Sequence, residues 1–92
     1  MKNKLGLNMK VLFENINKNS KGNKKFILKI VLNERNDYVV IQQAFACYPD
    51  GGEVLQSENK EIYSNLADLR EGKYARTRQG KLFIMSDFWT TA

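Results

Sequence analysis

The clearest pattern of apolar and polar positions lies in Tyr38–Gly52, where side chains alternate with the two-residue period of a β-strand. The strand should end at a tight turn, because segment 48–51 reads Tyr-Pro-Asp-Gly: Pro fixes φ at about −65° and Gly accepts a positive φ. A loop of Pro49–Gly51 predicts a hairpin that pairs Tyr48 with Gly52, Cys47 with Glu53, Ala46 with Val54 and Phe45 with Leu55. One face of this hairpin gathers the side chains that we predict to face the core: Val39, Ile41, Phe45, Cys47 and Leu55.

The same alternation predicts two earlier strands, at Met9–Ile16 and Phe26–Leu32. Between them, Asn17–Lys25 is polar and has nothing to bury, so we expect a hairpin loop. Asn33–Asp37 is expected to turn the chain into the strand that starts at Tyr38. Met1–Asn8 shows no sustained period and is expected to form an arm.

After the hairpin the period changes to that of a helix. Ser57 is a candidate N-cap, apolar residues recur at helical spacing from Ile62, and Gly72 supplies a stop, which predicts a helix over Glu58–Glu71. Two further strands, Lys73–Arg78 and Lys81–Met85, are expected to flank a turn at Gln79-Gly80, and 86–92 would form a tail. The predicted fold is a single small α+β domain over residues 1–92, an antiparallel sheet in the order β-β-β-β-α-β-β with one helix packed on one face.

Composition agrees with one modest domain and adds a charge. The chain has 92 residues, 42% of them hydrophobic, and a net charge of +5 that favours anionic partners. The charge is segregated, with eight basic residues against one acidic in Met1–Lys29 but three against eight in Ile30–Gly72. No apolar run reaches the roughly 18 residues of a membrane span, so no membrane partner is expected. The single cysteine, Cys47, fits a reducing, cytoplasmic setting.

Catalytic chemistry finds little support in these residues. The chain has no histidine and one cysteine, which removes the commonest general base, a Cys-His pair and a zinc cluster. Glu58, Glu61, Asp68 and Glu71 would lie on the solvated side of the predicted helix, although a two-carboxylate nuclease site stays open. No phosphate-binding glycine motif occurs, and we expect neither an enzyme nor a cofactor or metal.

The last predicted hairpin carries the candidate binding face. On one of its faces, rings that could stack on bases alternate with cations that could neutralise phosphates: Tyr74, Arg76, Arg78, Lys81 and Phe83. A structural interpretation competes with this one and is favoured, in which the same contacts support only the sheet or are covered by the tail.

Two other segments are open to both kinds of interpretation. Lys18, Lys21, Lys24 and Lys25 would form a cationic finger that follows phosphates, or a solubilising loop tip. Phe88 and Trp89 would close the core, which is the favoured interpretation, or anchor a partner.

These patterns predict a non-enzymatic, small, basic, cytoplasmic protein that binds nucleic acid or a nucleoprotein complex. The abundance of Lys, Asn and Ile suggests an AT-rich genome and, with it, a phage or mobile element. The alternative is a phage-type inhibitor of a host defence nuclease, anti-CRISPR or anti-restriction, that acts by protein–protein binding. The identity of the partner and the oligomeric state are left open by the sequence.

Overall fold

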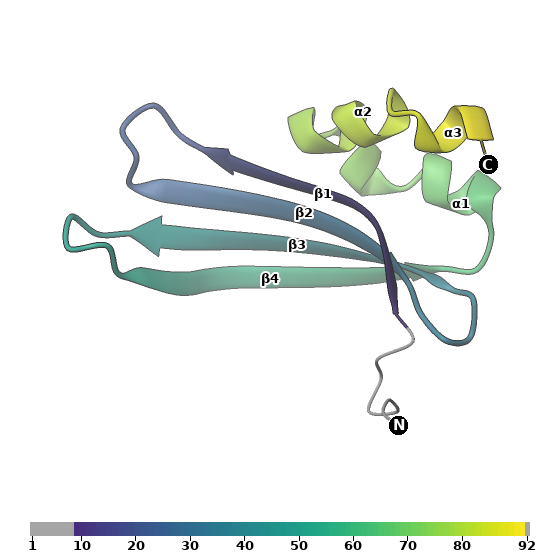
Figure 1. Cartoon of the computed structure of the whole chain (residues 1–92), viewed down its shortest axis with the longest axis horizontal. Coiled ribbons are helices and arrows are strands. Elements are labelled where there is room, and N and C mark those ends of the chain that lie inside the picture. Colours follow the sequence, from purple (N-terminus) through teal and green to yellow (C-terminus); the bar gives the residue numbers. More distant parts are fainter. Residues whose placement is uncertain (1–8, 92) are drawn as a thin grey trace.

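A single four-stranded antiparallel sheet forms most of the molecule (Figure 1). The computed structural model describes residues 9–91, so the arm predicted for Met1–Asn8 lies outside the described residues. The strands follow one another in sequence order: β1 (Lys10–Lys18), β2 (Lys24–Leu32), β3 (Tyr38–Cys47) and β4 (Glu53–Tyr63). The predicted α+β class is confirmed, and the strands of the antiparallel sheet precede the helices along the chain.

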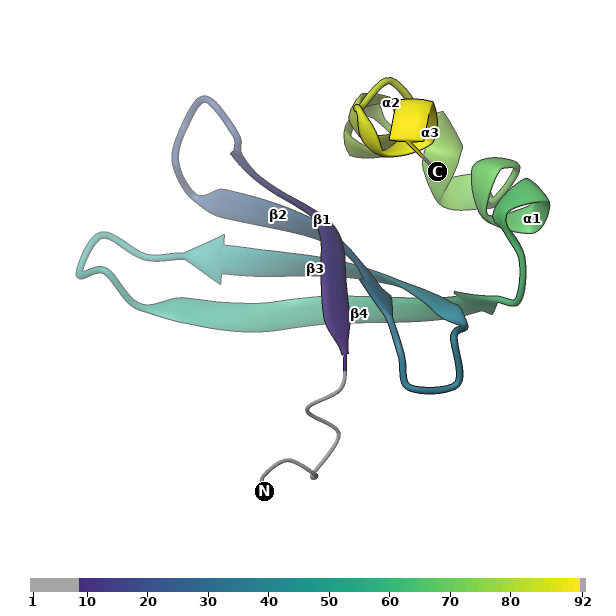
Figure 2. The ribbon, with the colours of Figure 1, turned by 45° about the vertical axis from the view of Figure 1, so that its right-hand side comes forward.

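A layer of short helices follows the sheet and covers one end of one of its faces (Figures 1 and 2). It consists of α1 (Leu66–Arg70), a 3₁₀ helix η1 (Lys73–Arg76), α2 (Arg78–Ile84) and α3 (Phe88–Thr91). Within residues 9–91, no helix has the length and apolar content needed to cross a membrane.

The predicted hairpin between β3 and β4 is confirmed down to its register. Phe45 lies opposite Leu55, Ala46 opposite Val54 and Cys47 opposite Glu53. The N–H of Tyr48 donates to the carbonyl of Gly52 at 2.9 Å, and Gly51 adopts the positive φ of 91° that the turn requires. Local turn chemistry therefore fixed this pairing.

The core-facing side predicted for this hairpin is wrong. The buried core lies on the other face, where Leu28, Ile30 and Val40 meet the helices, whereas Leu55 is 46% exposed and Phe45 is half-buried. Val39, on the predicted face, is also buried, so β3 is apolar on both sides at this end. Alternation alone could not say which side the helices would cover.

The helix predicted for Glu58–Glu71 is also wrong over its first half. β4 continues through Tyr63, because its backbone pairs with β3 along the whole of that strand. Helix α1 begins only after Asn65, whose side-chain oxygen accepts a hydrogen bond from the N–H of Asp68 at 2.8 Å. Ile62 consequently lies in a strand and is 65% exposed.

The two strands predicted at Lys73–Arg78 and Lys81–Met85 are helical instead. Thr77 caps α2, since its hydroxyl oxygen accepts from the N–H of Gly80 at 2.9 Å. Gly80 lies so close to η1 that a Cβ at this position would be 1.9 Å from the carbonyl oxygen of Tyr74. Gln79-Gly80 is thus the first turn of a helix that packs against the preceding one, and not a hairpin loop.

The lysine-rich loop is shorter than predicted. β1 extends to Lys18 and β2 starts at Lys24, which leaves only residues 19–23 as the connection. Asn19 closes it, because its side-chain oxygen and its N–H both bond to Lys24. Lys18, Lys24 and Lys25 therefore belong to strands.

Aromatic rings form the centre of the core between sheet and helices. Phe83 is fully buried, with ring centroids 5.1 Å from Phe13, 5.3 Å from Phe88 and 5.4 Å from Trp89. The β1–β2 ladder shifts between Val11 and Phe13, and β1 bends across its neighbours in Figure 2. The shift lets both Leu12 and Phe13 pack against the core.

Candidate functional site

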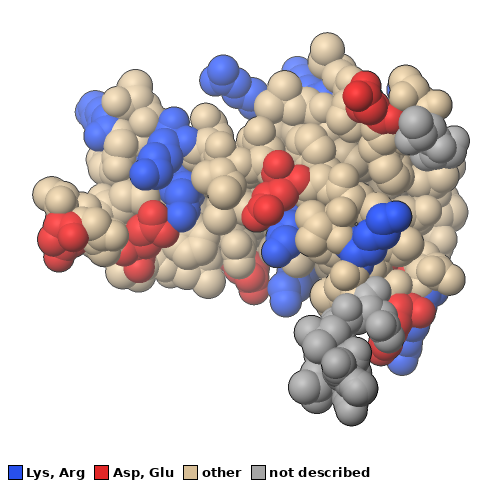
Figure 3. All heavy atoms as spheres, in the orientation of Figure 1, with Lys and Arg blue, Asp and Glu red and all other residues tan. Residues whose placement is uncertain are grey.

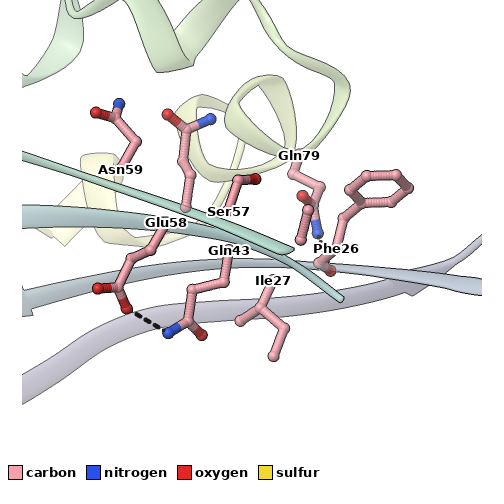
Figure 4. Close-up of a pocket in the computed structure, with 9 residues that line it drawn as sticks. Phe26, Ile27, Gln43, Ser57, Glu58, Asn59 and Gln79 are labelled. Carbon is pink, nitrogen blue, oxygen red and sulfur yellow. Dashed lines mark hydrogen bonds between the residues drawn. The ribbon is translucent and has the colours of Figure 1, made fainter. Parts of the chain in front are cut away.

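The sheet is longer than the helical layer, so part of the helix-covered face remains open beside α2. A hollow of about 360 Å³ lies there, which we call the groove. It is lined by residues of β2, β3, β4 and α2 (Figure 4): Phe26, Ile27, Gln42, Gln43, Ala44, Ser57, Glu58, Asn59 and Gln79.

The floor of the groove is made of uncharged side chains in two adjacent rows of the sheet. Phe26, Ala44 and Ser57 lie opposite one another in the first row, and Gln42 and Asn59 are paired in the next. These positions share the face of Leu28 and Val40, because residues two apart on a strand point to the same side. The Phe26 side chain is 36% exposed.

Gln79, from the first turn of α2, forms one wall and fixes this helix to the sheet. Its Nε2 donates to the carbonyl oxygen of Asn15 at 3.0 Å, to Asn15 Oδ1 at 2.8 Å and to the carbonyl oxygen of Phe26 at 3.0 Å. Figure 4 shows the Gln79 side chain beside the Phe26 ring. The wall and the aromatic residue are therefore held together by direct contacts.

The carboxylate that lines the groove, Glu58, is directed away from the floor. Gln43 Nε2 donates to Glu58 Oε2 at 2.6 Å, and both side chains extend to the other side of the sheet from Asn59 in Figure 4. Lys25 Nζ donates to Glu53 Oε1 at 2.6 Å, and this hydrogen bond lowers the pKa of Glu53 below its usual value. Glu61 lies on the groove face, one row beyond Asn59, and its Oε1 accepts a hydrogen bond from the Tyr63 hydroxyl.

Several of the predicted cations lie on the elements that border the groove. Lys24 is exposed and shares its face of β2 with Phe26, while Arg78 immediately precedes Gln79. Arg76 and Lys81 are exposed on η1 and α2, and Lys21 is exposed in the β1–β2 loop. Within residues 9–91, none of these five forms an ion pair.

Lys18 and Lys25 do not join this group. Both lie on the opposite face of the sheet, where they are paired across β1 and β2. Lys25 is engaged by Glu53 and lies over the ring of Phe45, with Nζ 5.0 Å from its centroid. The predicted loop of four free lysines does not form, because Lys18, Lys24 and Lys25 belong to strands and Lys25 is paired with Glu53.

Two predicted ring positions are in the core and not on a binding face. Tyr74 is 1% exposed and Phe83 is fully buried, because no hairpin forms and η1 and α2 direct both rings inwards. The hydroxyl of Tyr74 donates to the carbonyl of Leu69 at 2.5 Å, and burial raises the pKa of Tyr74 far above its ordinary value. No face of either ring is open to a base.

Phe88 and Trp89 are placed as a plug. Both are partly buried against Phe83, and their own ring centroids are 5.0 Å apart at a steep angle. The guanidinium carbon of Arg70 lies 5.2 Å from the centroid of the Trp89 ring on the outer side of this cluster. Such packing leaves these residues little surface with which to anchor a partner.

The opposite face of the sheet carries a different surface. Its edge strands expose four aliphatic side chains, each at least 46% accessible: Val11, Ile16, Leu55 and Ile62. Figure 3 shows basic and acidic residues interspersed on the side of the molecule that it presents, with uncharged areas between them. On the face opposite the helices, Glu14, Lys29 and Lys60 lie among the aliphatic groups. Such a mixture of charged and aliphatic groups resembles a protein-binding surface more than a phosphate-binding one.

Among residues 9–91 no three His, Cys, Asp or Glu side chains gather in a way that could hold a metal ion. No protein-family model matches the chain, and neither a curated protein nor a solved structure matches it. The groove's own residues therefore indicate what it can bind.

Sequence reasoning missed the groove because its floor comes from three strands and one helix. One signal was present, since Gln42 interrupts the apolar row that Val40, Ala44 and Ala46 form on one face of β3. Without the correct face for β3 and the strand assignment for Asn59, this signal could not be interpreted.

Proposed function

We propose that this protein is a non-enzymatic binding protein that acts on nucleic acid or on a nucleoprotein complex. The observation that carries the proposal is that Lys24 and Arg78 lie on two of the elements that line the groove and have no ion pair to a described carboxylate. Three more exposed cations without such an ion pair lie on the β1–β2 loop, η1 and α2: Lys21, Arg76 and Lys81. Unpaired cations beside a groove attract phosphate groups. Binding then releases the counterions that are condensed on the nucleic acid.

A second candidate is an inhibitor that binds a protein, such as a host defence nuclease. The observation that favours it is the exposure of Val11, Ile16, Leu55 and Ile62 on the other face of the sheet. The two candidates use opposite faces, so substitutions on one face test one candidate at a time.

The salt dependence of binding separates them. If five cations contact phosphates, the logarithm of the association constant should fall with the logarithm of salt concentration at a slope of about −3.5 for a single strand, from roughly −0.7 per phosphate. Replacing Arg76 and Arg78 by Glu removes two contacts and should flatten the slope to about −2.1. Fluorescence anisotropy of a labelled oligonucleotide measures both slopes.

A matched control changes net charge equally outside the groove. Arg35→Glu with Lys60→Glu alters exposed residues of the β2–β3 turn and of the opposite face, and should leave the slope near that of the native chain. No binding of the native chain even at about 50 mM salt, where phosphate contacts are strong, would reject nucleic acid as the direct ligand. Co-purification with a nuclease under those conditions would then favour the inhibitor.

A further inference from the structure

We propose that the groove holds an unpaired base, so that the ligand is a single-stranded nucleic acid and not a duplex. This inference rests on the proposed function, and it assigns a role to Phe26, Gln42 and Asn59, none of which carries charge.

The shape of the groove suits one base or a base with its sugar. Its volume of about 360 Å³ lies at the lower end of the range for small-molecule sites, which begins at about 300 Å³. In a duplex the base faces are stacked and the pairing edges are occupied. Only an unpaired base can therefore enter a hollow on the face of a sheet.

Phe26 supplies the stacking surface. As a residue Phe26 is 36% exposed and lines the groove, whereas Tyr74 and Phe83 are buried. The carbonyl of Phe26 accepts from Gln79 Nε2 at 3.0 Å, which holds this part of β2 against α2. Stacking on an aromatic ring is available to all bases, because each has a π face.

Gln42 and Asn59 supply groups for the edge of the base. They are direct cross-strand partners on the floor, and each amide offers both a donor and an acceptor. An amide can match the adjacent donor and acceptor that a base presents on an open edge. Gln79 differs from them, since its Nε2 is already committed to Asn15 and Phe26.

Cations at two borders of the groove complete the site. Lys24 lies on the same face of β2 as Phe26 two residues before it, and Arg78 precedes the Gln79 wall. A strand whose base lies over Phe26 would keep its phosphates outside the hollow, within reach of long cationic side chains. Charge complementarity thus favours a nucleic acid over an uncharged ligand with a similar ring.

The experiment compares three ligands of equal length: a single strand, its duplex, and a single strand with abasic sites in place of its central bases. The native chain should bind the intact single strand most tightly. Phe26→Ala should weaken that binding by about 5- to 150-fold, the effect of losing one stacked base, and should leave binding of the abasic strand nearly unchanged.

Two variants make this result specific. Phe26→Tyr keeps a ring and should retain most of the affinity, while Tyr48→Ala removes an exposed ring at the distant β3–β4 turn and should change nothing. Asn59→Ala, at an exposed strand position, should also weaken binding of the intact strand but not of the abasic one. Asn59→Ala therefore tests the base site independently if Phe26→Ala reduces folding.

The outcomes separate this inference from the proposed function. Equal binding of all three ligands, unaffected by Phe26→Ala and Asn59→Ala, would overturn the base site and leave a protein that binds phosphates. Tighter binding to the duplex would also overturn it. An absence of binding to every ligand at low salt would reject nucleic acid as the direct ligand of this protein, and the base site with it.

Discussion

Replacing Phe83 by Ala is the most direct test of the helical layer, because two incompatible roles predict opposite results. A binding ring on an exposed hairpin could be removed with little effect on stability. In the structure Phe83 is fully buried, and its ring centroid lies between 5.1 and 6.2 Å from those of Phe13, Tyr74, Phe88 and Trp89.

The expected loss is large for a chain of this length. Removing a buried Phe side chain costs about 3–5 kcal/mol, and four ring contacts place Phe83 towards the upper end of that range. A domain of 92 residues has a free energy of unfolding of about 5–14 kcal/mol. Phe83→Ala should therefore remove at least about a fifth of this free energy, and about a third or more if the loss reaches 5 kcal/mol.

Urea unfolding followed by far-ultraviolet circular dichroism measures this loss. With a slope of about 1 kcal/mol per M, the midpoint should fall by about 3–5 M. Phe45→Ala is the control, since Phe45 is half-buried on the other face and should cost clearly less. If Phe83→Ala does not fold at all, Phe83→Leu, which keeps most of the volume, should fold with a smaller loss. A loss below about 1 kcal/mol for Phe83→Ala, or one equal to that of Phe45→Ala, would refute the assigned core.

Three further results are expected. Ending the chain at Ser86 removes the Phe88 and Trp89 rings from Phe83, so it should lower the melting temperature and expose a surface that binds a hydrophobic dye; unchanged melting would contradict the plug. Gly80→Ala should destabilise by about 1–3 kcal/mol or more because its Cβ would be 1.9 Å from the Tyr74 carbonyl oxygen, whereas Gly52→Ala, 3.1 Å from a flexible Asp50 side chain, should cost little in the same urea titration. Burial, and after it the hydrogen bond to Glu61, raises the pKa of Tyr63 from 10.0 to about 12. In an alkaline titration followed by tyrosinate absorbance, Tyr63 should therefore ionise near pH 12, and Tyr63→Phe should remove this step from the titration curve. Because this pKa is raised in the folded protein, its contribution to stability is complete below about pH 10 and is lost between pH 10 and about 12.

The sequence by itself determined the elements whose structure depends on neighbouring residues. The three strands up to Cys47 were found, and the Pro-Asp-Gly turn fixed the register of β3 with β4, because turn chemistry and alternation act over a few residues. The favoured closing role of Phe88 and Trp89 also agrees with their packing on Phe83.

Tertiary structure decided what depends on long-range contact. Segment 58–63 has a weak helical pattern but becomes strand because β3 offers it a partner along its whole length. The rings of Tyr74 and Phe83 face the sheet because Thr77 starts a helix at this point. In that conformation both rings are buried in the same core as the apolar side chains of β2 and β3. The choice of core face on β3 followed from where these helices pack, since that strand is apolar on both sides at one end. The groove depends on all three decisions, because Asn59, Gln42 and Gln79 meet only when β4 is extended, the Val40 face is inward and α2 is a helix.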